Sequence, residues 1–285
     1  MNVAIAGASG MIGKRLRQRL VESGHVPSAI PRGAALPTCD AIVNLAGEPI
    51  AQRWTEAVKK RIYDSRVEGT RRLISAISMQ AQRPSVLVCA SAVGIYGSRG
   101  DEILTEKSAP GSGFLPHVVV DWEASARTAE ALGIRVISLR FGVVLGHGGA
   151  LAKLLTPFRL GAGGRLGSGR QWMSWIHIDD VVSLILLALE NATGAPLQGA
   201  VNATSPQPVT NAEFTRILAA ALHRPAFFPV PAFALKLAFG EMSQALLDSQ
   251  RALPAAAQAA GFHFQYPDLP AAVENILAAS SNSRT

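Results

Sequence analysis

A strand-like run followed by three evenly spaced glycines opens the chain and constrains its fold more than any other part. In AIAGASGMIGKRL, Gly7, Gly10 and Gly13 stand between an apolar run at residues 2–8 and an amphipathic helical pattern at residues 13–24. Gly7 permits a tight turn, Gly10 lets the backbone approach a diphosphate, and Gly13 allows close helix–strand packing. A helix that begins here offers free N–H groups to phosphates. The pattern predicts a dinucleotide site, and the alternative is a merely structural turn.

Strand-like and helical segments alternate through the first two hundred residues. Apolar runs predict further strands at residues 25–33, 41–47, 85–91, 135–142 and 199–204. Helical patterns cover residues 54–78 and 121–133 and the end of the segment 175–190. Apolar strands that alternate with helices favour a parallel sheet covered on both faces. We therefore predict an α/β protein with a Rossmann-type, doubly wound parallel sheet.

Two regions interrupt this alternation. Residues 146–170 are rich in glycine and predict a loop, a short helix and a second loop. From Pro206 onward the chain is mainly helical and interrupted by prolines. Because such sheets bind ligands at the carboxyl ends of their strands, we expect these parts to cover that edge. We predict a dinucleotide-binding domain over residues 1–205, with the segment 146–170 contributing to the cleft, and a smaller helical lobe over residues 206–285.

The chain is basic, with a net charge of +7 and a pI of about 9.9, but its charge is scattered. The densest cluster lies at helical spacing and consists of Arg53, Lys59, Lys60, Arg61, Arg66, Arg71 and Arg72. Such spacing is typical of solvated helix faces, and the alternative is a site for an anionic ligand such as a cofactor phosphate. The sequence has no RNA-binding signature and no zinc-finger spacing, so we expect no nucleic-acid partner.

Targeting and metal signals are missing from the sequence. The first residues, MNVAIAGASG, have no basic region or cleavage site, so we expect no secretory signal. The longest apolar run, VVSLILLAL, is too short to span a bilayer, so we expect no membrane partner. Cys39 and Cys89 lack metal-type spacing, and Cys89 lies in an apolar run. These features predict a cytoplasmic protein without a metal site. We expect a monomer or a homodimer.

The second predicted strand bears on the choice between the two nicotinamide nucleotides. A site that prefers NAD usually has an acidic residue at the end of this strand, where it binds the ribose 2′-hydroxyl. The segment HVPSAIPRG, residues 25–33, has no acidic residue but contains Arg32. A guanidinium can pair with a 2′-phosphate that a carboxylate would repel. The sequence therefore favours NADP(H), and the alternative is an ordinary exposed loop arginine.

Several further motifs carry a family resemblance. They are NLAGEPI at 44–50, SAVGIYG at 91–97, RFGVVLG at 140–146, GSGRQWMSWIHIDD at 167–180 and NATSPQPVTNAEF at 202–214. With the glycine loop, they make the chain resemble the atypical extended short-chain dehydrogenase/reductases known as "epimerase family proteins", which are NAD-dependent epimerase/dehydratase-like. The resemblance runs from residue 1 to about residue 277 and includes a C-terminal helical segment. It implies a Rossmann fold, NADP(H) binding and a substrate that is usually unassigned.

The resemblance also implies which residues surround the cofactor. The diphosphate would be lined by Ser9, Gly10, Met11 and Ile12. The adenosine and ribose would be followed by Leu45, Ala46, Gly47 and Glu48. Arg32 would meet the 2′-phosphate, Arg66 would reach back to the phosphates with Arg61 nearby, and Val143 and Val144 would lie near the nicotinamide. Each of these positions could instead serve plain packing.

The stretch GFLPHVVVDWEA, residues 113–124, departs from the usual reductase pattern. Counting from the flanking motifs puts the customary Tyr-x-x-x-Lys on Phe114 and Val118, and residues 108–134 contain no Tyr and no Lys. In that dyad the ammonium lowers the pKa of the phenol, which can then exchange a proton near neutral pH. The remaining candidates for proton transfer are Ser91 and Tyr96, and after them His117, Asp121 and Glu123. Tyr96 could equally be a packing residue.

The "WIHIDD" segment offers a further histidine. We interpret His177 as a hydrogen-bonded structural residue rather than a base, and we expect Asp179 to cap a helix that begins at Asp180. The sequence as a whole predicts an NADP(H)-dependent oxidoreductase or epimerase-like enzyme that acts on an unknown small molecule. The alternative is a non-catalytic NADP(H)-binding protein that senses redox state or acts as a scaffold.

Overall fold

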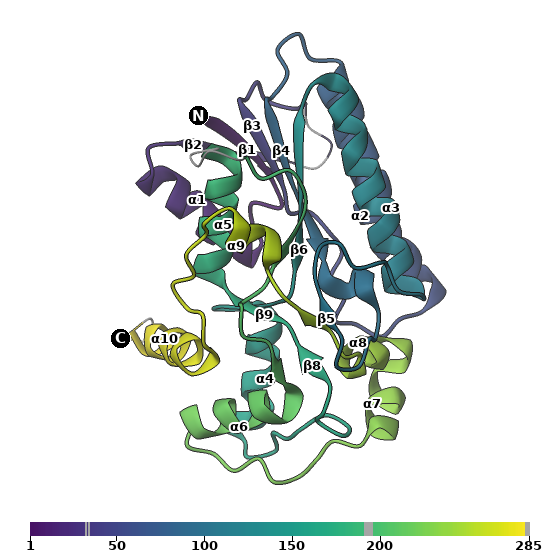
Figure 1. The fold of residues 1–285 in the computed structure, drawn as a ribbon, viewed down its shortest axis with the longest axis vertical. Coiled ribbons are helices and arrows are strands. Elements are labelled where there is room, and N and C mark those ends of the chain that lie inside the picture. The colour runs from purple at the N-terminus through teal and green to yellow at the C-terminus, as the bar shows by residue number, and fades with distance from the viewer. Residues whose placement is uncertain (32, 34, 191–195, 283–285) are drawn as a thin grey trace.

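The computed structural model describes residues 1–31, 33, 35–190 and 196–282. Its centre is a parallel six-stranded sheet with the order β10-β6-β4-β3-β1-β2 (Figure 1). The strands are β1 (Asn2–Ala6), β2 (Val26–Ile30), β3 (Ala41–Asn44), β4 (Val86–Ala92), β6 (Arg135–Phe141) and β10 (Gly199–Ala203). The predicted Rossmann-type α/β fold is confirmed.

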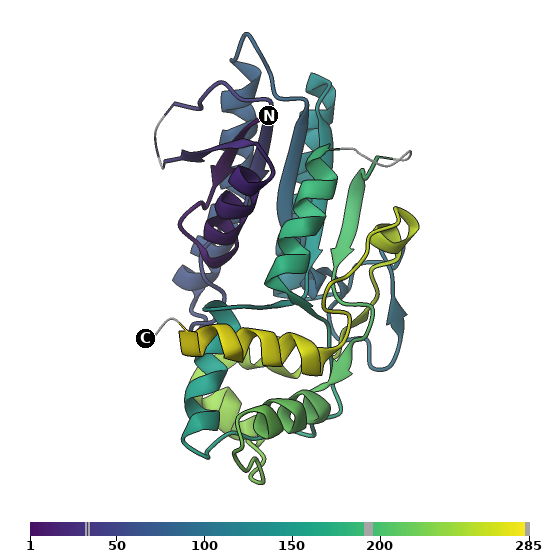
Figure 2. The same ribbon diagram turned by 90° about the vertical axis from the view of Figure 1, so that its left-hand side faces the viewer.

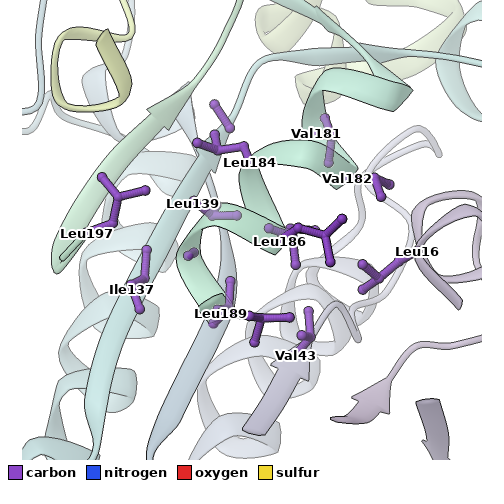
Figure 3. Close-up of a cluster of buried hydrophobic side chains, with 14 of the residues drawn as sticks. Leu16, Val43, Ile137, Leu139, Val181, Val182, Leu184, Leu186, Leu189 and Leu197 are labelled. Carbon is purple, nitrogen blue, oxygen red and sulfur yellow. The ribbon is translucent and has the colours of Figure 1, made fainter. Parts of the chain in front are cut away.

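Helices cover both faces of this sheet. Figure 1 shows α1 (Met11–Glu22) and α5 (Ile178–Glu190) on one side and α2 (Glu56–Ser78) and α3 (Phe114–Arg127) on the other. On the first side, Leu16 of α1 and Leu184 of α5 are fully buried in one cluster with strand residues such as Val43 and Leu139 (Figure 3). Burying an aliphatic side chain of this size stabilises the fold by roughly 1.5–3 kcal/mol.

The order in which successive strands join the sheet reverses between β1 and β3. After β2, residues 31–40 lead back across β1 to β3, and none of those that the structure describes is helical. β2 pairs with one side of β1 and β3 pairs with the other. The carboxyl ends of β1 and β3 therefore flank the topological switch point, the crevice in which open α/β sheets bind ligands.

A smaller lobe lies beyond the carboxyl ends of the strands (Figures 1 and 2). Its helical elements are α4 (Gly149–Arg159), α6 (Asn211–Ala221), α7 (Ala232–Phe239), η3 (Gly240–Met242), α8 (Ser243–Leu247) and α10 (Leu269–Asn282). Its strands are β7 (Val143–Leu145), β8 (Trp172–Met173), β9 (Trp175–His177) and β11 (Val209–Thr210). β7 pairs with β9, and β8 pairs with β11.

The core of this lobe is built from segments far apart in the sequence. One hydrophobic cluster contains Leu155 and Phe158 of α4, Trp175 of β9, Phe214 of α6 and Val273 of α10. The glycine-rich segment and the C-terminal helices therefore share one core. The division near residue 205 into two domains remains a proposal.

Smaller elements join the sheet to the lobe. They are η1 (Val93–Tyr96), β5 (Ile103–Leu104), β12 (Arg251–Ala252) and α9 (Ala255–Ala259), whereas η2 (Thr128–Leu132) joins α3 to the amino end of β6. β12 pairs with β5, so the chain that returns from the lobe is fastened beside the end of β4. Among the described residues, no helix combines the length and the apolar character needed to cross a membrane.

Predicted helix starts differ from the observed ones by two residues at α1 and α2 and by more at α3. α3 begins at Phe114, seven residues before the predicted start, and Pro116 lies in its first turn, where proline is tolerated. α5 begins at Ile178, so Asp179 lies inside its first turn and does not cap it. His177 takes that role, because its Nδ1 lies 3.1 Å from the backbone nitrogen of Asp179 and accepts its hydrogen.

Candidate functional site

The loop after β1 has room only for glycine at two positions. Gly7 has a φ of 81°, and its carbonyl oxygen accepts the backbone N–H of Gly10 at 3.0 Å. A Cβ atom on Gly7 would lie 2.8 Å from the carbonyl atoms of Leu45, and one on Gly13 would lie 2.3 Å from the oxygen of Gly7. The loops that follow β1 and β3 therefore pack directly on each other at the switch point.

The N-terminus of α1 is open. Gly10 is the N-cap residue, no side chain caps the helix, and its first turn has no acidic residue. Ser9 and Gly10 are exposed, and Met11 and Ile12 are half-buried. An anion can therefore approach the first backbone N–H groups and the positive end of the helix dipole. This part of the site fits a cofactor diphosphate.

The glycine-rich segment before α4 reaches the same end of α1. A Cβ atom on Gly149 would lie 3.1 Å from Cε of Met11, and one on Gly148 would lie 3.6 Å from its Sδ. Gly148 is the N-cap of α4, which has no side-chain cap either. Gly148 and Gly149 therefore border the start of α1, and the contribution of the whole segment 146–170 to the cleft remains a prediction.

Hydrogen bonds from backbone N–H groups hold the loop after β3 in place. The N–H of Leu45 donates to the oxygen of Ala6 at 2.9 Å, and that of Ala46 donates to Oδ1 of Asn44 at 3.3 Å. Further along, the N–H of Glu48 donates to Oγ of Ser65 on α2 at 3.0 Å. Leu45, Ala46, Gly47 and Glu48 thus form a wall beside the glycine loop at the switch point.

Arg66 lies directly behind this wall. Its Nη1 donates to the carbonyl oxygens of Glu48 at 3.0 Å and Ile62 at 3.3 Å, and its Cζ lies 5.3 Å from the centre of the Trp122 ring. A Cβ atom on Gly47 would lie 3.2 Å from Cζ of Arg66, so glycine lets the guanidinium lie flat against the loop. Burial lowers the pKa of Arg66 to about 10. Its contact with a cofactor phosphate remains a prediction.

The other predicted cofactor residues are spread more widely. Arg61 is half-exposed, and its Nε lies 3.5 Å from Oε1 of Glu48. Val143 follows the end of β6, and its N–H donates to the oxygen of Ser174 at 2.8 Å. Arg32 lies outside the described residues, so its role also remains a prediction.

Ser91 and Tyr96 are brought together at the end of β4 by a buried ion pair. Oγ of Ser91 donates to Oε1 of Glu123 at 2.6 Å. Nε and Nη2 of Arg140 donate to the two carboxylate oxygens of Glu123, each at 2.8 Å. Nη1 of Arg140 donates to the Tyr96 hydroxyl at 3.0 Å, and that hydroxyl donates to Oδ1 of Asn202 at 2.7 Å.

This network closes off both candidate hydroxyls from solvent. Ser91 is 3% exposed and Tyr96 is completely buried. Burial raises the pKa of Tyr96, and the neighbouring Arg140 opposes that rise. The network continues through Oε1 of Glu106, which accepts the N–H groups of Asn202 at 2.9 Å and Ala256 at 3.1 Å. It therefore also fastens the chain that returns from the lobe.

Sequence reasoning missed Arg140, Asn202 and Glu106. A signal for Arg140 was present, because it interrupts the otherwise apolar strand RVISLRF. A charged side chain in a central strand requires a buried partner. No such signal marked Asn202 or Glu106.

A sequence profile places the chain among known proteins. The profile of the NAD dependent epimerase/dehydratase family matches residues 3–203. The chain belongs to this family. A second profile, a domain of unknown function named DUF1731, matches residues 230–276, within the lobe.

Two close relatives of this epimerase/dehydratase chain cover nearly its whole length. The epimerase family protein YfhF of Bacillus subtilis is 40% identical over 98% of both chains. The structure of human epimerase family protein SDR39U1, crystallised with NADPH, is 36% identical, has a TM-score of 0.91 and covers 98% of this chain and 99% of its own. The UDP-glucuronic acid 4-epimerase of Bacillus cereus, at 16% identity and a TM-score of 0.79, shares the fold over 99% of this chain and all of its own.

Phe114 and Val118, which stand where the usual Tyr-x-x-x-Lys dyad would lie, face α2. The Phe114 ring meets Trp54 edge-on with centroids 5.2 Å apart, and Val118 is buried in the same cluster. One residue further along α3, Leu115 and Val119 face the end of β4. A Cβ atom on Gly94 would lie 3.7 Å from Leu115, and Val119 packs in the cluster of Tyr96. Both registers therefore present apolar side chains.

The remaining polar candidates lie away from Ser91. Oδ2 of Asp121 accepts the hydroxyl of Tyr63 at 2.7 Å and lies 3.6 Å from Nε2 of His117, which is exposed on the α2–α3 surface. Glu123 forms the ion pair described above. His177 is 1% exposed, and burial lowers its pKa to about 4, so its ring is neutral. Within the described parts of the chain, no group of His, Cys, Asp or Glu side chains could hold a metal ion.

Proposed function

We propose that this epimerase/dehydratase-family protein binds NADP(H) in the crevice between β1 and β3 and acts as an oxidoreductase or epimerase-like enzyme on a small molecule. The uncapped N-terminus of α1, set at the switch point behind Gly7 and Gly10, carries the proposal. The human relative crystallised with NADPH, at 36% identity over nearly the whole chain, supports it. We place the protein in the cytoplasm as a monomer or homodimer.

Each part of the crevice has a proposed role. The backbone of Ser9, Gly10, Met11 and Ile12 binds the diphosphate, since this helix end is exposed and lacks a side-chain cap. The wall from Leu45 to Glu48 follows the adenosine and ribose, and Arg66 and Arg61 supply positive charge behind it. Arg32 binds the 2′-phosphate. Val143 lies beside the nicotinamide, the group that gives or takes a hydride when the cofactor is bound.

The mechanism also needs a group that donates or accepts a proton. We propose that the chain lacks the usual Tyr-x-x-x-Lys dyad, because α3 presents Leu115 and Val119 to the end of β4. Ser91 and Tyr96 are the proposed donors, since both hydroxyls sit at that strand end and contact the Glu123–Arg140 pair. A substrate with its own acid or base would need neither.

A non-catalytic role is the second candidate. The observation that favours it is the burial of Ser91 and Tyr96, whose hydroxyls are already occupied by protein groups. In that case the protein would bind NADP(H) tightly and serve as a redox sensor or scaffold.

Titration of NADPH and NADH, followed by fluorescence, tests the cofactor assignment. We expect NADPH to bind more tightly, and Arg32→Ala to lose about 1.5–3 kcal/mol of that preference, because a charge-assisted pair to the 2′-phosphate is removed. Gly10→Val should abolish binding, because a branched side chain would occupy the diphosphate path.

Gly69→Ala is the matched control, because a Cβ there meets only the Asp64 oxygen at an ordinary 3.7 Å within α2. It should bind like wild type. Equal wild-type affinities for the two nucleotides would refute the NADP(H) assignment. A Gly10→Val protein that binds normally would show that the loop is only a turn.

A further inference from the structure

Large apolar side chains are exposed together on the lobe. The α7 patch consists of Phe227, Phe228, Phe233 and Leu237, and each of these residues is between 74% and 84% exposed. Phe233 and Leu237 lie one helical turn apart on α7, and the two adjacent phenylalanines precede that helix. The chain at Val230 runs beside the loop after α4, because its N–H donates to the oxygen of Arg165 at 2.8 Å.

α7 is an unusual surface helix. Its sequence is AFALKLAF, yet only Leu235 is buried and Ala234 half-buried. An ordinary surface helix buries its apolar stripe against the core. Exposed apolar patches of this kind mark interaction sites. Figure 1 shows α7 at the end of the molecule away from the N-terminus, where the lobe projects beyond the sheet.

Two segments at the α7 patch carry only positive charge. Residues 156–170 and 222–240 contain no Asp or Glu, and their cations are Arg159, Arg165, Arg170, Arg224 and Lys236. All five are exposed. Arg53 adds a further cation, because its Nη1 donates to the oxygen of Leu237 at 3.2 Å. The adjacent Glu241 shares Lys59 of α2 with Glu56.

We propose that the α7 patch docks on the surface of a bilayer that contains anionic lipids. Exposed phenylalanine and leucine beside lysine and arginine form the combination that lies in the lipid interface and attracts anionic headgroups. The net charge of +7 acts in the same direction. A second copy of this chain would meet the patch with the same five cations, and like charges across a two-fold interface oppose association.

This interaction differs from the membrane contact considered in the sequence. The expectation of no membrane partner rested on the length of apolar runs, which decides only whether a segment can span. A patch that lies on a bilayer needs no such run, since it buries only the outer side chains.

Vesicle flotation of the full chain tests the proposal. We expect it to float with vesicles of phosphatidylcholine mixed with phosphatidylglycerol, to stay in solution with phosphatidylcholine alone, and to be released by salt. Phe227→Ser combined with Phe233→Ser should weaken binding about tenfold or more, because two anchors are lost. Arg224→Gln combined with Lys236→Gln should weaken it by a similar factor.

Met79→Ser is the control, because Met79 is 78% exposed but lies at the far end of α2. It should float like wild type, and unchanged thermal melting of all variants shows that they fold. The proposal is overturned if wild type binds neither vesicle, if it binds both equally, or if the double phenylalanine variant floats normally. It is also overturned if wild type forms a dimer that the double phenylalanine variant abolishes, because the patch then covers a second copy.

Discussion

Glu123→Gln should clearly destabilise the fold of this protein. Glu123 is 8% exposed and Arg140 is 7% exposed, and the carboxylate accepts two hydrogen bonds from the guanidinium at 2.8 Å. The amide keeps the shape but removes the negative charge, which leaves Arg140 buried without its counter-ion. Breaking a buried pair in this way costs about 3–5 kcal/mol.

The size of the effect in a melting experiment follows from the chain length. Unfolding entropy is roughly 2.1 cal/mol/K per residue, so a loss of about 3–5 kcal/mol over a chain of this length lowers Tm by about 5–8 °C. Intrinsic fluorescence during a thermal ramp would measure this shift, since Trp122 packs beside Arg66 in the same region.

Glu102→Gln provides a matched control. Glu102 also accepts two hydrogen bonds from one arginine, Arg99, at 2.7 and 2.8 Å, but its side chain is 48% exposed. An exposed pair contributes only about 0–1 kcal/mol, so Tm should fall by less than about 2 °C. Equal shifts for the two variants would refute the argument, because burial would then not decide the cost. Arg140→Gln added to Glu123→Gln should recover part of the loss, since no unpaired charge remains.

Two further predictions concern histidine and the candidate donors. His177 has a pKa of about 4 in the folded protein against 6.5 when unfolded, so the unfolded chain binds a proton there at higher pH than the folded protein does. The free energy of unfolding should therefore fall as pH drops from about 6.5 to about 4. His177→Gln should flatten that part of a curve of Tm against pH. If a substrate is found, Ser91→Ala and Tyr96→Phe should each lower kcat by about 100-fold or more. Full kcat in both variants would show that neither residue is the proton donor. Tight NADPH binding without any turnover would favour the sensor role.

The elements that sequence could predict are those fixed by local patterns. The glycine loop is one, because the close approach of Gly13 to Gly7 involves residues six apart. The start of α3 is harder to predict from local patterns, because Pro116 lies in its first turn although proline disrupts a helix interior.

The candidate site also has a part that the sequence could predict and a part that it could not. The phosphate end could be predicted, since the strand, the turn and the helix are contiguous. The buried network could not, because Asn202 and Glu106 come from positions nearly a hundred residues apart and are joined only by the fold. The helical spacing around Arg66 is typical of a solvated helix face. Its buried position behind Gly47 depends on how α2 packs on the loop after β3, which the sequence does not show.

The interleaved path of the chain limits how the cleft can open. The polypeptide passes between sheet and lobe at the ends of β6, β9 and β10, and the segment through β12 and α9 returns again before α10. A hinge works when one or two short segments absorb a rotation. Here a rotation would have to bend several connections together and pull β12 from β5. Nucleotide exchange should therefore proceed through small movements of the loops around Gly10 and Gly148, with the lobe remaining a fixed wall.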